Sequence, residues 1–265
     1  MPTRKSQAIR SGNGSSISVQ SYLGFKQVSK SFDSNSVLDH VSFTVMRGET
    51  LCIMGRSGVG KSVCLRILMG FLKPDSGRVI AAGEDITDYS EDQVDRIHRK
   101  VTMVLQDGGL FDSLTIGDNV AFAMRERGEL TEPEIDRSVD SLLDTVGIRP
   151  LRDCFPADIS AGMRRSVAIA RAPAEKPEAV LYDEPTTMVD PPMGQRLGDL
   201  IASVKVQLEL TSVVVTHDTE LVEKLADQIL FLDHGKILFF GTVGEMERSS
   251  EPVVKEFLKD DQLGV

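Results

Sequence analysis

A glycine-rich loop between two apolar segments is the feature that most constrains the fold of this chain. The loop follows the apolar segment 51–54, which is typical of a buried strand, and precedes the apolar segment 63–69, which is typical of a buried helix. It reads G-x-x-x-x-G-K-S and consists of Gly55, Arg56, Ser57, Gly58, Val59, Gly60, Lys61 and Ser62. A strand, a glycine loop and a helix in this order predict a phosphate-binding turn.

The physical basis of such a turn is anion capture by the backbone. Glycine permits tight turns, so several N–H groups can converge on one phosphate, and the start of the following helix adds the positive end of its dipole. Lys61 supplies a charge for the β- and γ-phosphates, and the Ser62 hydroxyl can ligate Mg²⁺. The alternative is a glycine-rich turn with a chance lysine, and the flanking strand and helix argue against it.

Length and charge limit the class of protein. The 265 residues suit one α/β core with a subdomain, and an apolar fraction of 41% is enough for a packed core. The 30 basic and 40 acidic residues give a net charge of −10, which argues against nucleic-acid binding as the main task.

Cysteine usage and hydropathy indicate a cytosolic chain. Cys52, Cys64 and Cys154 form no C-x-x-C pair, so we expect reduced, packed thiols and no metal site. No apolar run reaches the roughly 18–20 residues that span a bilayer, and no signal peptide is expected. Residues 1–20 are basic and rich in Ser and Gly, which predicts a disordered leader; a tail that binds anionic lipid or a partner is the alternative.

The apolar patterns divide residues 21–245 into a core with a helical insert. We expect a helical subdomain at about 113–160, with a helix after the capping box Thr131–Glu134 that ends at Gly147, and a C-terminal tail at 246–265 with a weak helical pattern. The expected strands are 24–32, 37–45, 78–82, 101–105, 179–182, 212–215, 229–232 and 236–240.

Polar residues follow three of the predicted strands. Asp183 and Glu184 come directly after 179–182, Gln106 follows 101–105, and His217 follows 212–215. Ligands bind at the carboxyl ends of parallel strands, so Asp183 could ligate Mg²⁺ and Glu184 could be the general base for attack on a γ-phosphate.

The two remaining strand-end residues suit the same chemistry. Gln106 could orient water and reach the metal, and His217 could hydrogen-bond the γ-phosphate. A solvated turn for the acid pair and a structural role for the histidine are the plainer alternatives.

Taken together, these motifs resemble the nucleotide-binding subunits of ABC transporters over about residues 24–245. The resemblance implies a P-loop NTPase fold of the ABC type, with a mixed α/β sheet core, an antiparallel β subdomain and a helical subdomain. It implies ATP and Mg²⁺ as ligands and a head-to-tail homodimer that encloses two ATP molecules. Phe32, an aromatic residue in a turn-rich loop, would stack on adenine, and Gln106 would lie in the loop that couples to the membrane subunit.

The resemblance also assigns roles near the second half of the chain. Asp190 would lie in the loop that links the two ATP sites, and a signature loop would close on the ATP of the opposite subunit. The signature residues would be Ser160, Ala161, Gly162 and Met163.

The signature loop departs from the usual L-S-G-G-Q of that family. Ala161 adds a Cβ, which is costly if the position needs a positive φ and only tightens the fit to phosphate if it does not, so the hydrolysis rate is in question. Met163 lacks the polar side chain of glutamine. Pro173 predicts an early end of the helix that follows.

The segment 105–122 resembles ATPases of Mce-type (Mla-like) lipid transporters more closely, as does Met163. That group implies an integral-membrane permease, an Mce-domain lipid-binding protein, a small STAS-domain protein that can bind the ATPase, and a peripheral position on the cytoplasmic face of the inner membrane. The cargo would be phospholipid or another hydrophobic molecule.

Three other functions stay open at this stage. The chain could power an importer of amino acids or other small solutes. It could be a soluble ABC ATPase of DNA repair or translation, although its single phosphate loop and short helical insert argue against this. It could be a regulatory module that binds ATP and hydrolyses it poorly, which Ala161 would favour.

Overall fold

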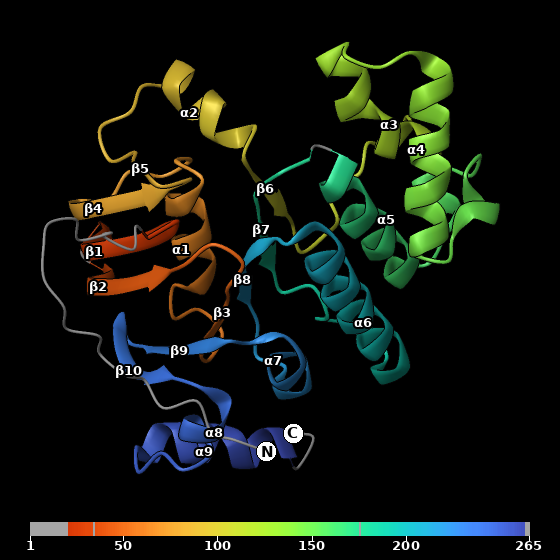
Figure 1. Cartoon of the computed structure of the whole chain (residues 1–265). Coiled ribbons are helices and arrows are strands. Elements are labelled where there is room, and N and C mark those ends of the chain that lie inside the picture. The colour runs from red at the N-terminus through yellow and green to blue at the C-terminus, as the bar shows by residue number, and fades with distance from the viewer. Residues whose placement is uncertain (1–20, 34, 175, 263–265) are drawn as a thin grey trace, which may run out of the picture.

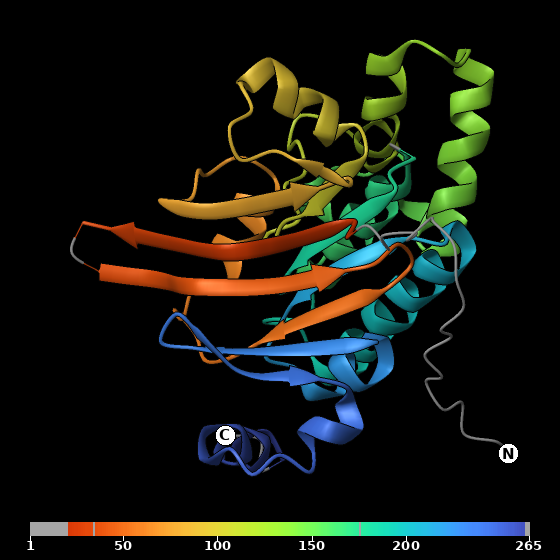
Figure 2. The same ribbon diagram turned by 60° about the vertical axis from the view of Figure 1, so that its left-hand side comes forward.

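The computed structural model describes residues 21–33, 35–174 and 176–262. The leader predicted over 1–20 therefore lies outside the described residues, as do residues 263–265 of the predicted tail. The fold contains two sheets and a separate group of helices (Figures 1 and 2).

The central sheet is mixed and has the strand order β10-β9-β3-β8-β7-β6. Strand β3 pairs in parallel with β8 and β9, and β7 pairs in parallel with β6 and β8, whereas β10 is antiparallel to β9. Because β3, β7 and β8 are buried along their whole length, they read in the sequence as continuous apolar runs. The strands are β3 (Thr50–Met54), β6 (Val101–Val104), β7 (Ala179–Asp183), β8 (Thr211–Val215), β9 (Gln228–Asp233) and β10 (Lys236–Gly241).

The second sheet is antiparallel, with the order β2-β1-β4-β5. Its inner residues share one apolar cluster with β3 and with helix α1 (Lys61–Leu68), which starts inside the glycine loop. Strand β2 alternates between buried and exposed residues over 41–45, as predicted for a half-buried strand. The strands are β1 (Leu23–Phe32), β2 (Asn35–Val45), β4 (Ser76–Ala81) and β5 (Glu84–Asp85).

A second apolar cluster covers the other face of the central sheet. It contains residues of α5 (Ala161–Ala174), α6 (Pro191–Leu208), α7 (Thr219–Leu225), α8 (Val243–Met246) and α9 (Pro252–Gln262). Helix α9 confirms the helical pattern predicted for the tail, and it lies below the β9–β10 hairpin in both views (Figures 1 and 2).

The predicted helical insert is present. Helices α3 (Ile116–Arg127) and α4 (Glu132–Thr145) pack on α5 around a third apolar cluster. The capping box of Thr131 and Glu134 starts α4, and Gly147 adopts a φ of 69° just after its end, both as predicted. Two 3-10 turns, Arg149–Leu151 and Pro156–Asp158, connect α4 to α5, and α2 (Glu91–His98) precedes β6.

The prediction for Pro173 was wrong. Helix α5 runs through this residue and ends at Ala174. The proline lies in the last turn, so the backbone hydrogen bond that it removes affects only the end of the helix. No helix in the described part of the chain combines the length and the apolar character needed to cross a membrane.

Candidate functional site

A cavity of about 430 Å³ opens at the carboxyl ends of the central strands. Its walls come from β1, β2, the glycine loop, the start of α1 and the loops that follow β6, β7 and β8. The lining residues are Phe32, Val37, Ser57, Gly58, Gly60, Lys61, Ser62, Val63, Gln106, Glu184, Thr187 and His217. The structure thus brings together residues that the sequence placed in six separate segments.

The glycine loop has the conformation of an anion-binding turn. Gly55 has a φ of 144°, and a Cβ built there would lie 2.2 Å from the carbonyl oxygen of Leu232, so no side chain fits. Among the described residues, no acceptor takes a hydrogen bond from the N–H groups of Ser57, Gly58 or Gly60. These free donors line the cavity, as a phosphate group would require.

Lys61 is held at the mouth of the loop. Its Nζ donates to the carbonyl oxygens of Gly55 at 2.7 Å and Arg56 at 3.1 Å, and it lies 3.3 Å from Oε1 of Glu184. The side chain is only 6% exposed, so its charge acts in a poorly solvated environment, where it attracts an anion more strongly than it would in water.

Asp183 does not itself line the cavity, but it contacts Ser62, which does. The Ser62 hydroxyl donates to Oδ1 of Asp183 at 2.7 Å. Burial raises the pKa of Asp183, and the hydrogen bond from Ser62 opposes that rise. A divalent cation would favour the ionised carboxylate in the same way.

Two adjacent oxygen donors fit Mg²⁺. This ion binds to one or two protein oxygens and takes its other ligands from phosphates and water. No group of three His, Cys, Asp or Glu residues in the described ranges could hold a metal alone, so a phosphate would have to complete this site.

Glu184 is the most constrained residue of the cavity. Its φ is 47°, a left-handed conformation that is strained for a glutamate and common at functional sites. Oε2 accepts hydrogen bonds from Thr187 Oγ1 at 2.8 Å and from Nδ1 of His217 at 2.9 Å.

These contacts determine whether the Glu184 carboxyl is ionised. Burial tends to raise the pKa of Glu184, but the hydrogen bonds from His217 and Thr187 and the charge of Lys61 together lower it below its usual value. The hydrogen bond to Glu184 raises the pKa of His217. An ionised carboxylate fixed in this way can accept a proton from a water molecule.

Gln106 and Phe32 both line the cavity. Gln106 follows β6, as predicted, and is exposed. Phe32 ends β1 and is 44% exposed, with Nζ of Lys30 at 5.6 Å from the ring centroid. An exposed ring at the rim leaves a face on which a base can stack.

The predicted signature residues do not reach this cavity. Ala161 is the first residue of α5 and has no positive φ, so the backbone cost considered for its Cβ does not arise. Gly162 faces Met193 of α6, and a Cβ on the glycine would lie 2.7 Å from its Cγ. The Ser160 hydroxyl accepts from the N–H of Met163 at 3.2 Å, and Ser160 and Ala161 are exposed.

Asp190 also lies outside the cavity. Its carboxylate accepts from the N–H of Met193 at 3.0 Å and caps the start of α6. Gly55, Arg56 and Val59 shape the glycine loop without lining the cavity.

Sequence reasoning missed three lining residues, Val37, Val63 and Thr187. Thr187 lies three positions after Glu184, and its hydroxyl was a local signal that could have been used. Val37 comes from β2 and reaches the site only because the antiparallel sheet packs against the central one, which no local pattern records.

Comparison with known proteins gives one family and several relatives. The family model described as ABC transporter matches residues 38–187. The chain is 34% identical over 241 residues to the intermembrane phospholipid transport system ATP-binding protein MlaF of Escherichia coli K12, which covers 91% of this chain and 90% of that protein. It is 35% identical over 226 residues to the methionine import ATP-binding protein MetN 2 of Pseudomonas entomophila, covering 85% and 68%.

A solved structure with the same architecture contains nucleotide. The dimeric, post-hydrolysis state of the ATP-binding cassette MJ0796, bound to ADP and Pi, superposes with a TM-score of 0.77 at 28% identity. The match covers 83% of this chain and 98% of that one.

Proposed function

Because the chain belongs to the ABC transporter family and is therefore an ATPase of that type, we propose that it powers the movement of phospholipid or another hydrophobic molecule through an Mce-type transporter. The observation that supports the catalytic part best is the position of Glu184. It lies between Lys61 and His217 in the cavity that the glycine loop lines.

The geometry suits hydrolysis of the terminal phosphate. Lys61 and the loop N–H groups would hold the β- and γ-phosphates, and Glu184 would take a proton from the attacking water as its oxygen bonds to the γ-phosphorus. The bond to the oxygen between the β- and γ-phosphates then breaks and leaves ADP and inorganic phosphate. His217 fixes Glu184 through Nδ1, which leaves Nε2 for the γ-phosphate.

Ser62, Asp183 and Gln106 would hold the Mg²⁺ site. The bound cation would neutralise charge on the phosphate oxygens. Asp183 and Ser62 already share a hydrogen bond of 2.7 Å, so both oxygen donors are positioned before any cation binds.

The second half of each ATP site would come from another copy of this chain. Ser160, Ala161, Gly162 and Met163 start α5 away from the cavity, and the turn containing Ser160 is exposed. The similar cassette MJ0796 is a dimer with ADP and Pi, which supports a homodimer here.

Similarity to MlaF supports the lipid assignment and its partners. We infer a peripheral position on the cytoplasmic face of the inner membrane, bound to a permease, together with an Mce-domain protein and a small STAS-domain protein. Three exposed apolar side chains in the segment 105–122, which begins next to Gln106, would offer a surface for the permease: Leu105, Phe111 and Phe122, the two rings lying 4.8 Å apart.

A small-solute importer is the second candidate. It is favoured by the 35% identity to a methionine import ATP-binding protein. The cavity and its residues would serve both functions equally, so the choice depends on the membrane partner.

The test is purification of the native complex from detergent-solubilised membranes, with its proteins and lipids identified by mass spectrometry. A permease that co-purifies with an Mce-domain protein and phospholipid supports the proposal. A solute permease without an Mce-domain protein overturns the lipid assignment and leaves the ATPase intact.

A further inference from the structure

The C-terminal helix α9 packs on β9, the strand that pairs with β3 just before the glycine loop (residues 55–62). Val254 of α9 is fully buried, and the ring of Phe257 meets that of Phe231 edge-on, with centroids 5.1 Å apart. Phe231 lies on β9 and pairs with Met54, the last residue of the strand that enters the loop. Helix α9, which lies beside the β9–β10 hairpin in Figure 2, therefore packs on the partner strand of β3, the strand that leads into the loop.

One ionic contact joins α9 directly to the loop. Nη2 of Arg56 donates to Oε2 of Glu256 at 2.7 Å, although the two residues are 200 positions apart in the sequence. The carbonyl oxygen of Arg56 in turn accepts a hydrogen bond from Nζ of Lys61 at 3.1 Å. Glu256 is thus connected to the lysine of the site through a single intervening residue.

We propose that α9 braces the glycine loop of its own chain, with Glu256 as a positioning residue that favours nucleotide binding through Arg56. A loop that is held in its binding conformation loses less conformational freedom when the phosphates arrive, and this increases affinity. The proposal rests on the nucleotide-binding role of the loop proposed above. The helix lies outside residues 38–187, the part of the chain that the family model covers, and the proposal gives it a role in nucleotide binding.

The charge of Glu256 alone would have the opposite effect on nucleotide affinity. Glu256 is a negative charge beside a site for a highly negative ligand, so removing it should strengthen binding if the charge acts only through space. If Glu256 instead favours binding by holding Arg56 and the glycine loop in position, removing its carboxylate should weaken nucleotide binding. The two effects can therefore be separated by the direction of the change.

The experiment is titration of the full-length chain with a fluorescent ATP analogue and Mg²⁺. For Glu256→Gln we expect Kd to rise about two- to fivefold, since an exposed ion pair contributes modestly. Phe257→Ala changes no charge and should also raise Kd. The matched control is Glu247→Gln, which removes a charge from the exposed end of α8 and should leave Kd unchanged or slightly lower it.

A double-mutant cycle tests the link to Arg56. In an Arg56→Gln background, Glu256→Gln should cause no further weakening, because its partner is already gone. The melting temperature without nucleotide is recorded for every variant, because a merely structural role for α9 would lower it and leave Kd unchanged.

Each outcome decides between the two proposals. Failure of the wild-type chain to bind the analogue would overturn the proposed function. Binding by the wild type, with Glu256→Gln equal to or tighter than it, would overturn the brace alone.

Discussion

Nδ1 of His217 lies 2.9 Å from Oε2 of Glu184, across the ends of the neighbouring strands β8 and β7. The glutamate is 12% exposed and the histidine 49%, so the contact spans the boundary between the protein interior and the open cavity. It holds the acid in one orientation and, together with Lys61 and Thr187, keeps its pKa low.

Glu184→Gln should abolish turnover and spare nucleotide binding. Glutamine has nearly the same shape but cannot accept the proton of the attacking water, and loss of a general base costs about 10²–10⁴-fold in rate. Phosphate release measures the loss, and binding of a fluorescent ATP analogue serves as the control. Unchanged phosphate release would assign the base to another group, or would identify the chain as a module that hardly hydrolyses ATP.

Thr187→Val should slow turnover without weakening ATP binding. The substitution keeps the side-chain shape and removes the hydroxyl that donates to Glu184 at 2.8 Å. A hydrogen bond to a charged group contributes about 1.5–3 kcal/mol, so we expect kcat to fall by about tenfold or more with KM little changed. Thr145→Val, on the exposed face of α4, is the matched control. Equal kcat values for the two variants would contradict a positioning role for Thr187.

Removal of divalent cations should stop hydrolysis, and Ser62→Ala should raise the Mg²⁺ concentration needed for half-maximal rate. The serine hydroxyl and Asp183 are two of the protein oxygens that fit the ion, and loss of one weakens the site. The measurement is ATPase rate against free Mg²⁺, with excess chelator as the zero point. A Mg²⁺ dependence identical to wild type would exclude Ser62 as a ligand.

Local patterns predicted most of the strands, the glycine loop and the polar residues after three of those strands. They worked because β3, β7 and β8 are buried on both faces and because parallel strands end at one edge of the sheet. Lys61, Glu184 and His217 therefore met where expected.

Contacts between distant segments could not be predicted in this way. Val37 reaches the cavity through the packing of two sheets, and Glu256 reaches Arg56 across 200 positions of sequence. Pro173 was misjudged for a related reason, since packing of α5 in two apolar clusters outweighs the loss of one backbone hydrogen bond.

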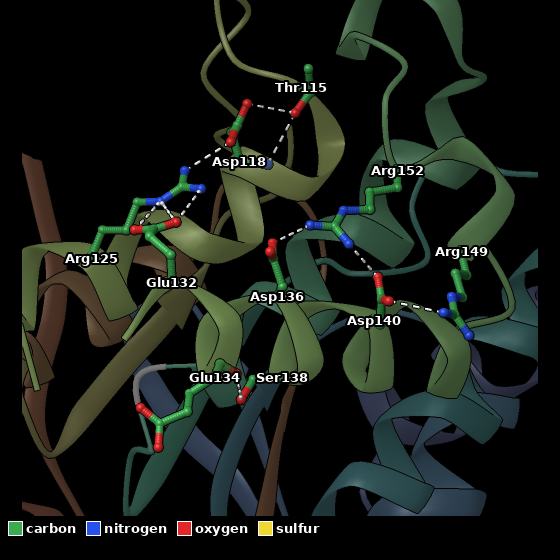
Figure 3. Close-up of polar contacts among 10 residues, drawn as sticks. All are labelled: Thr115, Asp118, Arg125, Glu132, Glu134, Asp136, Ser138, Asp140, Arg149 and Arg152. Atoms are coloured by element: carbon green, nitrogen blue, oxygen red, sulfur yellow. Dashed lines mark hydrogen bonds and ion pairs between the residues drawn. The ribbon is translucent and has the colours of Figure 1, made fainter. Parts of the chain in front are cut away.

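Helix α4 bears a stripe of acidic side chains, and we expect the stability of the helix to depend on three arginines that pair with them. Glu132, Asp136, Asp140 and Asp144 follow at intervals of four residues, and like charges at this spacing destabilise a helix. Arg125, Arg149 and Arg152 pair with the stripe (Figure 3).

Arg152 is the central member of this network. It contacts Asp136 and lies 2.7 Å from Asp140, and its carbonyl oxygen accepts from the N–H of Gly117 at the start of α3. Arg152→Met keeps much of the side-chain stem and removes both ion pairs. We expect a loss of about 1 kcal/mol, hence a fall in Tm of about 2–4 °C at low ionic strength.

Salt separates the ionic part of this effect from lost packing. At about 1 M salt the Debye length falls to about 3 Å, so the difference in Tm between Arg152→Met and the wild type should shrink. Arg137→Met, an exposed arginine on the same helix, should change Tm by less at either ionic strength. If the two variants melt alike at low salt, the network contributes nothing to α4. If the Arg152→Met difference persists undiminished at high salt, the effect is not ionic and comes from packing of the guanidinium end, because methionine keeps the part of the stem that lies against Gly117.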